Sequence, residues 1–476
     1  MIKPLTKENA DIAGHYPTKV IQFGEGNFLR AFADWCIDAM NANIGFDAGV
    51  AIVQPIERGM TSMLNDQDNL YHHLIRGLKN GKEVKENRLI SCINEAIDPF
   101  KDAAAYFKHA HSEDLKLIIS NTTEAGIQFD DTDLPEADQL AKTFPGKLTQ
   151  LLKKRFDHFE GSAASGLVFI PCELIEKNGE ALKKAILDYA DLWSLGDAFK
   201  SWITTHNFFA NTLVDRIVPG FPKDEIDEIR SELGYDDQLV VSSEVFHLWV
   251  IEGPKEVQDA FPADQAGLNV KFVADLVPYR TRKVRILNGA HTCMVPVGLL
   301  AGIPTVRESV EDKNVGAFIQ AAIAEEIATT IELPQDELNA FSNEVIERFK
   351  NPFIRHELKS ISLNSISKFK VRVLPTIKDF FEKNETLPKR LIFSFACLIK
   401  LYLWDEFSIN DDQEVTDFFK ELKAQNHTSN EITHNILSKS AFWGEDLNQI
   451  PGLTSLLVSY LDQLATKDLV EVLNDL

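Results

Sequence analysis

Residues 19–31 read Lys19-Val20-Ile21-Gln22-Phe23-Gly24-Glu25-Gly26-Asn27-Phe28-Leu29-Arg30-Ala31. This stretch passes from a short apolar run into a glycine turn, and the amphipathic segment 32–40 follows it. Strand, glycine turn and helix in this order are the context of a dinucleotide-binding turn, where glycines let the pyrophosphate approach the helix N-terminus. The third glycine of the usual GxGxxG pattern is missing, so an ordinary turn between strand and helix would also explain these residues.

Three further runs in the first half, at 49–54, 115–120 and 166–171, have the near-continuous hydrophobicity of strands buried on both faces. Longer amphipathic segments separate them, which is typical of a parallel sheet with crossover helices. Beyond residue 282 the pattern changes to long helical stretches: 283–300, 315–331, 338–349, 387–402, 413–424 and 453–464. We therefore predict an α/β fold, with a Rossmann-type, doubly wound dinucleotide-binding domain at 1–277 and a mainly α-helical substrate and catalytic domain at 278–476.

Composition and charge exclude several classes of protein. With 476 residues, 44% of them hydrophobic and 25% charged, the chain has the composition of a globular protein of two or more domains. A net charge of −23 repels nucleic acid and anionic membrane, so we expect neither as a partner. The apolar runs are shorter than the roughly 20 residues of a membrane span, and the N-terminus lacks an apolar signal core. We expect a cytoplasmic monomer or small homo-oligomer with a small-molecule ligand.

Residues that commonly bind metals do not cluster in the sequence. The five cysteines are scattered and never form a CxxC pair, which argues against a disulfide framework and a structural zinc site. His72-His73 lacks the companions of a zinc site, and we interpret it as a partly exposed pair. The sequence therefore predicts no metal cofactor.

The carboxyl ends of the predicted strands are where a ligand should bind in an open α/β sheet. After the first strand we expect cofactor contacts from five residues: Phe23, Gly24, Gly26, Asn27 and Phe28. The second strand ends at Gln54, where an acid commonly binds the ribose hydroxyls of NAD. We expect NAD rather than NADP, although Arg58 could meet a 2′-phosphate.

The third strand ends in hydroxyl and carboxylate side chains. Thr123 is a further candidate for the cofactor and Glu124 for the substrate. A loop or helix cap would also explain Glu124.

In the second half, Lys283, Asn288 and His291 are spaced five and three residues apart. At about 100° per residue these positions fall within an arc of roughly 140°, so one helix face can present all three. Lysine can act as a general acid or base, an asparagine amide can bind a carbonyl oxygen, and a neutral histidine can bind a hydroxyl. Three arginines would lower the pKa of the lysine by their charge: Arg280, Arg282 and Arg285. A basic helix start with a histidine in the core would also explain this segment.

The KxxxxNxxH spacing resembles the signature of the polyol-specific long-chain dehydrogenases, the mannitol dehydrogenase family. The resemblance covers nearly the whole chain. It includes the glycine turn at 23–31, the segment 211–219, and the Cys172-Glu173 pair followed by Asn178-Gly179.

This resemblance implies a metal-independent, NAD-linked reaction on a sugar or polyol. Lys283 would protonate the carbonyl oxygen in reduction and accept the hydroxyl proton in oxidation. Asn178 and Asn288 would polarise that oxygen, and His291 would hold a neighbouring hydroxyl. Two further residues match the family's substrate pocket: Asp215 and Lys368.

The basic run Arg280-Thr281-Arg282-Lys283 is unusual in so acidic a chain. Because arginine binds a planar carboxylate with two charge-assisted hydrogen bonds, we interpret the run as part of a site for a sugar acid. Arg280 would bind the carboxylate, with Lys368 and Arg372 adding positive charge. Rival hypotheses are another keto sugar acid, a neutral polyol or hexitol phosphate, and a nucleotide-binding protein without turnover. The intact Lys283, Asn288 and His291 set argues against the last, since a pure binder needs no proton donor.

Overall fold

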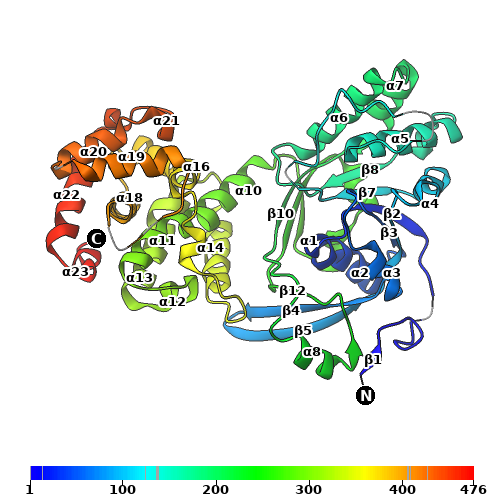
Figure 1. Cartoon of the computed structure of the whole chain (residues 1–476), viewed down its shortest axis with the longest axis horizontal. Coiled ribbons are helices and arrows are strands. Elements are labelled where there is room, and N and C mark those ends of the chain that lie inside the picture. Colours follow the sequence, from blue (N-terminus) through cyan, green and yellow to red (C-terminus); the bar gives the residue numbers. More distant parts are fainter. Residues whose placement is uncertain are drawn as a thin grey trace. The chain divides into compact units, whose positions relative to one another are not determined.

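A computed structural model describes residues 2–12, 14–123, 125–135, 139–404, 407, 409–425 and 427–476. The chain divides into two compact units (Figure 1). The first comprises Met1–Arg76 and Glu83–Leu276, and the second comprises Gly77–Lys82 and Val277–Leu476.

A six-stranded parallel sheet forms the centre of the first unit. Its strands are β2 (Thr18–Phe23), β3 (Gly49–Val53), β6 (Ile93–Ile97), β7 (Leu117–Ser120), β8 (Val168–Pro171) and β9 (Phe208–Phe209). They lie in the order β6-β3-β2-β7-β8-β9, which is the 3-2-1-4-5-6 order of a Rossmann fold. The four strands predicted from apolar runs are confirmed. The order reverses between β2 and β7, and the crevice at the carboxyl ends of these two strands is where such sheets bind dinucleotides.

Helices cover both faces of this sheet because successive strand residues point to opposite faces and both sets are apolar. Val20 and Ile52 pack in one core cluster with residues of α1 (Asn27–Ala31) and α2 (Ala33–Ile44). Ile21 and Val53 pack in another cluster with residues of α5 (Phe144–His158) and α6 (Asn178–Leu192). The predicted doubly wound α/β fold is confirmed. The remaining helices of this unit are α3 (Thr61–Asp66), α4 (Ala103–Phe107), α7 (Asp197–His206), α8 (Ile226–Leu233) and α9 (Lys255–Ala260).

Smaller sheets in the first unit were not predicted. One has the order β12-β4-β5, and another the order β10-β13-β14. Their strands are β4 (Tyr71–Lys79), β5 (Lys82–Ile90), β10 (Asn211–Asp215), β12 (Val241–Ser243), β13 (Leu248–Glu252) and β14 (Val270–Val273). Two short strands also pair in parallel, β1 (Lys3–Pro4) and β11 (Tyr235–Asp236). The tip of the β4–β5 hairpin, residues 77–82, is grouped with the second unit.

The second unit is mainly helical, as predicted. One helix runs from Val277 to Leu300 and consists of α10 (Val277–Arg282), the π-helical segment η4 (Lys283–Asn288) and α11 (Gly289–Leu300). The long helix α18 (Lys389–Leu403) packs on α11, where the Ser394 hydroxyl donates to Cys293 O at 2.7 Å. The other helices are α12 (Val306–Glu311), α13 (Lys313–Ala321), α14 (Gln335–Phe349), α15 (Leu358–Ile361), α16 (Ser365–Arg372), α17 (Leu374–Asn384), α19 (Gln413–Ala424), α20 (Ser429–Leu437), α21 (Ser440–Trp443), α22 (Leu453–Thr466) and α23 (Leu469–Asn474).

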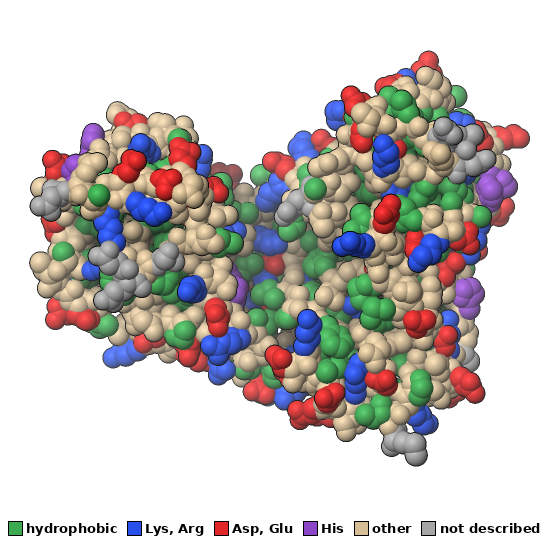
Figure 2. All heavy atoms as spheres, in the orientation of Figure 1, with side chains coloured by type: hydrophobic (Ala, Val, Ile, Leu, Met, Phe, Trp, Pro, Cys, Tyr) green, Lys and Arg blue, Asp and Glu red, His purple; other side chains and the backbone are tan. Residues whose placement is uncertain are grey.

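His72 and His73 are not a partly exposed pair, because the two residues are only 6% and 0% exposed. They lie on β4, the middle strand of its sheet, and His73 Nε2 is 2.7 Å from the Ser243 hydroxyl of β12. Within the described ranges, no helix combines the length and hydrophobicity that a membrane span requires. On the face drawn in Figure 2, acidic and basic side chains are interspersed.

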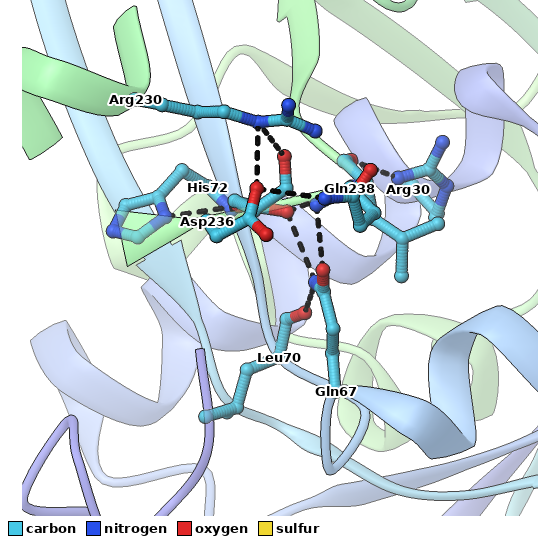
Figure 3. Close-up of polar contacts among 9 residues, drawn as sticks. Arg30, Gln67, Leu70, His72, Arg230, Asp236 and Gln238 are labelled. Carbon is cyan, nitrogen blue, oxygen red and sulfur yellow. Dashed lines mark hydrogen bonds and ion pairs between the residues drawn. The ribbon is translucent and has the colours of Figure 1, made fainter. Parts of the chain in front are cut away.

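Figure 3 shows a buried polar network in the first unit that includes Gln67 and His72. Both residues donate hydrogen bonds to Asp237, the acid that holds this network together. Its carboxylate accepts hydrogen bonds from His72 N (2.7 Å), Gln67 Nε2 (3.0 Å) and Leu239 N (2.7 Å), and it lies 3.0 Å from His72 Nδ1. Burial acts to raise the pKa of Asp237, but these hydrogen bonds outweigh it and hold the pKa below its usual value. Arg30 joins the network by donating to Leu239 O at 2.6 Å, so α1 is fastened to the loop that carries Asp237.

Replacing Asp237 by alanine should strongly destabilise the first unit. The substitution leaves several buried donors without an acceptor, each costing about 1–3 kcal/mol, so we expect about 3 kcal/mol less unfolding free energy in denaturant titrations. Asp236→Ala is the matched control, since the neighbouring side chain is 54% exposed and its ion pair with Arg230 lies at the surface. Equal losses for the two variants would contradict the role of the buried network.

Candidate active site

The glycine turn has the geometry of a dinucleotide site. Gly24 has φ +116°, and a Cβ at this position would lie 2.9 Å from Asn121 O of the loop after β7. A side chain is therefore excluded by backbone conformation and by space. A Cβ at Gly26, in contrast, would meet nothing within 4 Å. The turn thus passes close to the loop after β7 and leaves open space beside Gly26, as a bound pyrophosphate requires.

Buried side chains hold the carbonyl groups of this turn from behind. Gln22 Nε2 donates to Gly24 O at 3.1 Å, and Arg30 Nε donates to Glu25 O at 3.2 Å. Arg30 is 1% exposed and also donates to Asn27 Oδ1 at 2.7 Å. The sequence analysis missed these two supports, because nothing local distinguishes a buried glutamine or arginine from an exposed one.

Three of the predicted cofactor residues have structural contacts of their own. Phe23 is fully buried between Tyr106 and Phe144, so only its main chain can reach a ligand. Phe28 is half-buried and stacks on Phe32. Asn27 is exposed at the turn, although its amide oxygen is engaged by Arg30.

The side chain of Gln54 points inward and holds the loop after β3 by hydrogen bonds. It is 2% exposed, and its Nε2 donates to Ile56 O (2.9 Å) and Glu57 O (3.1 Å) while its Oε1 accepts from the Thr61 hydroxyl (2.9 Å). A hydrogen bond to a ribose hydroxyl would require one of these contacts to break. Arg58, the alternative partner for a 2′-phosphate, is exposed in the same loop.

Asn178 is fully buried at the start of α6. Its Nδ2 donates to Pro171 O (3.0 Å) and Glu173 O (3.1 Å), and its Oδ1 accepts from Thr212 N (2.8 Å). The amide therefore ties the end of β8 to β10. This geometry does not support the predicted contact with a substrate oxygen, because both polar atoms of the amide are already engaged.

The other predicted residues of the first unit are Thr123, Glu124 and Asp215. Thr123 follows β7 and has φ +72°. Asp215 ends β10 and is 5% exposed. Glu124 lies outside the described residues.

The helix of residues 277–300 carries Lys283, Asn288 and His291. The π-helical segment η4 begins at Lys283 and ends at Asn288. The predicted regular α-helix starting at residue 283 was therefore wrong in its start and in its local geometry. A π-turn bonds residue i to residue i+5, which brings residues five apart closer to the same side of the helix than an α-helix does. On an α-helix the same pair would diverge by about 140°. The π-turn therefore brings Lys283 and Asn288 to one side of the helix.

His291 is 8% exposed and lies against the ring of Phe349, with 4.2 Å between ring centroids, and edge-on to His356. Burial, with the positive charges of His356, Arg348 and Arg372, holds its pKa well below the ordinary 6.5, so the ring is neutral. Its Nε2 is buried and makes no hydrogen bond with any described residue. A buried polar atom of this kind is suited to a ligand hydroxyl.

Lys368 and Arg372 lie four residues apart on α16, which packs on α11 so closely that a Cβ at Gly289 would be 3.0 Å from Arg372 O. Lys368 Nζ donates to Ile361 O at 2.8 Å. Burial and the charge of Arg372 lower the pKa of Lys368. The structure thus brings Lys368 and Arg372 to the same part of the second unit as His291.

The arginines around Lys283 do not form one uncompensated cluster, contrary to expectation. Arg282 is buried and forms an ion pair with Glu337 at 2.6 Å, and Arg285 forms one with Asp379 at 2.5 Å. Arg280 is half-exposed on α10. Among the described residues, no group of three or more His, Cys, Asp and Glu side chains could hold a metal ion.

The strand order and the glycine turn at its reversal point define the first unit as a dinucleotide-binding domain of the Rossmann type. Residues 18–263 match the family model of the mannitol dehydrogenase Rossmann domain, and residues 275–465 match that of the mannitol dehydrogenase C-terminal domain. The chain belongs to the mannitol dehydrogenase family. It is accordingly an oxidoreductase, a dehydrogenase that acts on CH–OH groups.

Relatives and solved structures agree with this assignment. The altronate oxidoreductase of Bacillus subtilis (strain 168) is 49% identical over 464 residues, 97% of this chain and 96% of the relative. That of Bacteroides thetaiotaomicron is 45% identical over 476 residues, 99% of each chain. A D-sorbitol dehydrogenase has a similar fold (TM-score 0.79, 21% identity, 97% of this chain and 95% of that one). So does the Pseudomonas fluorescens mannitol 2-dehydrogenase in its complex with NAD and D-mannitol (TM-score 0.67, 22% identity, 99% of each chain).

The depressed pKa of His291 predicts a pH-dependent stability. The unfolded chain takes up a proton here near pH 6.5, whereas the folded protein does not, so stability should be lost as pH falls below that value. In His291→Gln, the loss between about pH 7.5 and 5.5 in denaturant titrations should be smaller by about 1 kcal/mol. His434→Gln, at an exposed position of α20, should behave like the parent protein. A parallel pH dependence for both variants would show that His291 is not held neutral.

Proposed function

We propose that this enzyme interconverts D-tagaturonate and D-altronate, with NADH as the reductant and NAD as the oxidant. The observation that supports the proposal is the helix of residues 277–300. Its π-helical segment begins at Lys283 and ends at Asn288, and the buried, neutral His291 follows three residues later. The names of the 49% and 45% identical relatives support altronate as the substrate, and the NAD complex of the mannitol 2-dehydrogenase supports the cofactor. A bound nicotinamide dinucleotide would supply or accept the hydride.

Lys283 would transfer the proton. In reduction its Nζ would donate a proton to the carbonyl oxygen as the ketone becomes an alcohol, and in oxidation it would accept the hydroxyl proton. The Asn288 amide would donate a hydrogen bond to the same oxygen, and the unpaired Nε2 of His291 would bind a neighbouring hydroxyl. These groups make the reaction independent of a metal ion. Asn178 would act indirectly, by holding the edge of β8 and β10.

The acid group of the substrate would be bound by positive side chains of the second unit. Arg280, Lys368 and Arg372 are the candidates that we propose. Arg282 and Arg285 form ion pairs with Glu337 and Asp379. Lys368 and Arg372 have one feature that favours an anion, since their mutual repulsion falls when an anion binds between them. Asp215 is a proposed polar contact to the sugar.

A screen of NADH and NADPH oxidation with tagaturonate, fructuronate and fructose tests the proposal. We expect the highest kcat/KM with tagaturonate and NADH, and no loss of rate after exhaustive chelation. Preference for fructuronate would identify the other keto sugar acid as substrate. Preference for fructose would show that the enzyme acts on a neutral sugar, and the proposed carboxylate site would then be wrong.

Replacing Lys283 by alanine should lower kcat by about 10² to 10⁴-fold, which is the usual contribution of a general acid or base. NADH affinity, measured by the fluorescence of the bound cofactor, should stay nearly unchanged because the glycine turn belongs to the other unit. Lys420→Ala, at a 74% exposed position, is the control and should keep full activity. Near-normal turnover by the Lys283 variant would show that this lysine is not the general acid or base.

Charge reversal at Arg280 should raise KM for tagaturonate by roughly 10- to 100-fold, since a charge-assisted hydrogen bond contributes about 1.5–3 kcal/mol. Activity with fructose, which has no carboxylate, should fall much less. Arg307→Glu, on an exposed side chain of the same unit, controls for the change in net charge. If Arg280→Glu affects both substrates equally, Arg280 is structural, and the same comparison at Lys368 and Arg372 would locate the carboxylate.

A further inference from the structure

Glu173 is a buried acid at the carboxyl edge of the central sheet, with no role in the chemistry proposed above. It lies two residues after the end of β8 and is 2% exposed. Its Oε2 accepts from the Ser120 hydroxyl at 3.0 Å, and its Oε1 accepts from both Thr122 N and the Thr122 hydroxyl at 2.9 Å. Among the described residues it forms no ion pair. Burying a carboxylate without a cation is unfavourable, so such a residue needs a reason.

All donors to Glu173 come from the end of β7 and the loop that follows it. An ionised carboxylate only accepts hydrogen bonds, so its two oxygens match three donors without conflict. A glutamine in its place would keep one oxygen for the Thr122 donors and lose the second acceptor. The conformation of this loop therefore favours a carboxylate over an amide at position 173.

The same loop is strained at the next residue. Thr123 has φ +72°, a region that β-branched residues rarely adopt, and such strain persists only where the surroundings impose it. On the other side of Thr123 the loop turns back, because Gly126 N donates to Thr123 O at 3.0 Å. A Cβ at Gly126 would lie 1.9 Å from the Thr122 hydroxyl, so the turn closes tightly on Thr122. Glu173 thus fixes Thr122, which precedes the strained Thr123 and lies against Gly126.

This loop forms one wall of the crevice between β2 and β7, where the strand order reverses. Ser120 pairs in register with Phe23, and Asn121 N donates to Phe23 O at 3.0 Å. Asn121 O is also the atom closest to a Cβ built on Gly24. The loop and the glycine turn therefore face one another across the position at which open α/β sheets bind dinucleotides.

We propose that Glu173 is a positioning residue for the dinucleotide cofactor: it fixes Thr122, and thereby holds the strained Thr123 backbone against the glycine turn in the conformation that binds the cofactor. This inference rests on the proposed use of a nicotinamide dinucleotide, and not on the identity of the sugar. It assigns the acid to cofactor binding and leaves proton transfer to Lys283.

Fluorescence titration of the full-length protein with NADH, without substrate, tests the proposal. Glu173→Ala should weaken NADH binding by roughly tenfold or more, the effect of losing a buried charge-assisted hydrogen bond, while kcat at saturating NADH changes little. Glu173→Gln should recover most of the affinity because one oxygen still accepts from Thr122. Glu326→Ala is the control: this buried acid of the second unit accepts from two main-chain amides, Arg390 N and Leu391 N, both at 2.9 Å, and forms an ion pair with Arg390 at 3.5 Å. It should lower Tm without changing NADH affinity.

A double-mutant cycle with Thr123→Gly separates positioning from general stability. Glycine adopts positive φ without strain, so Glu173→Ala should weaken NADH binding much less when residue 123 is glycine. Unchanged affinity in Glu173→Ala, or an equal loss in both backgrounds, would overturn the proposal while leaving the proposed function intact. If the parent protein binds NADH but does not reduce tagaturonate, the proposed function fails and the role of Glu173 can still be measured.

Discussion

Residues five apart do not lie on the same side of a regular α-helix, and this geometry constrains the helix of residues 277–300. The proposed reaction requires Lys283 and Asn288 on one side of the helix, while its continuation, α11, is almost wholly buried. The π-turn resolves the conflict by widening one stretch of the helix. Ion pairs hold the widened turn from two helices, at Arg282 with Glu337 of α14 and at Arg285 with Asp379 of α17. Two arginines that the sequence analysis named as positive neighbours of Lys283 thus form ion pairs that hold this part of the helix.

In the first unit, the conformation of the glycine turn depends in a similar way on buried polar groups behind it. Asp34, whose pKa burial raises to about 7, accepts from Tyr71 and Gln22, and Gln22 also holds the carbonyl of Gly24. Arg30 holds the carbonyl of Glu25. Gln22 and Arg30 thus anchor two consecutive carbonyl groups of the turn by hydrogen bonds, which makes the turn rigid before a ligand arrives. A rigid turn lowers the entropy lost on binding.

The elements that were predicted correctly are those whose signal is local. The strands β2, β3, β7 and β8 are apolar on both faces, so each is visible in the sequence as one continuous apolar run. The β4–β5 hairpin was missed, although Asn80-Gly81 is a hairpin signal and both residues have positive φ. Polar His72 and His73 hid the strand, since their partners Asp237 and Ser243 are more than 160 residues away. The hydrogen bonds of the Gln54 and Asn178 amides to main-chain groups could not be predicted, because neither strand position nor family resemblance shows which groups an amide binds.

The assignment of residues 77–82 to the second unit has a consequence for how this protein can evolve. The polypeptide crosses from one unit to the other three times, after Arg76, after Lys82 and after Leu276. Recombination at a single junction would therefore separate the hairpin tip from the unit with which it packs, including its bond from Gly81 N to Glu347. Exchange of whole catalytic modules between such enzymes is thereby disfavoured, and new substrate preferences should arise mainly through point changes within an inherited pair of units.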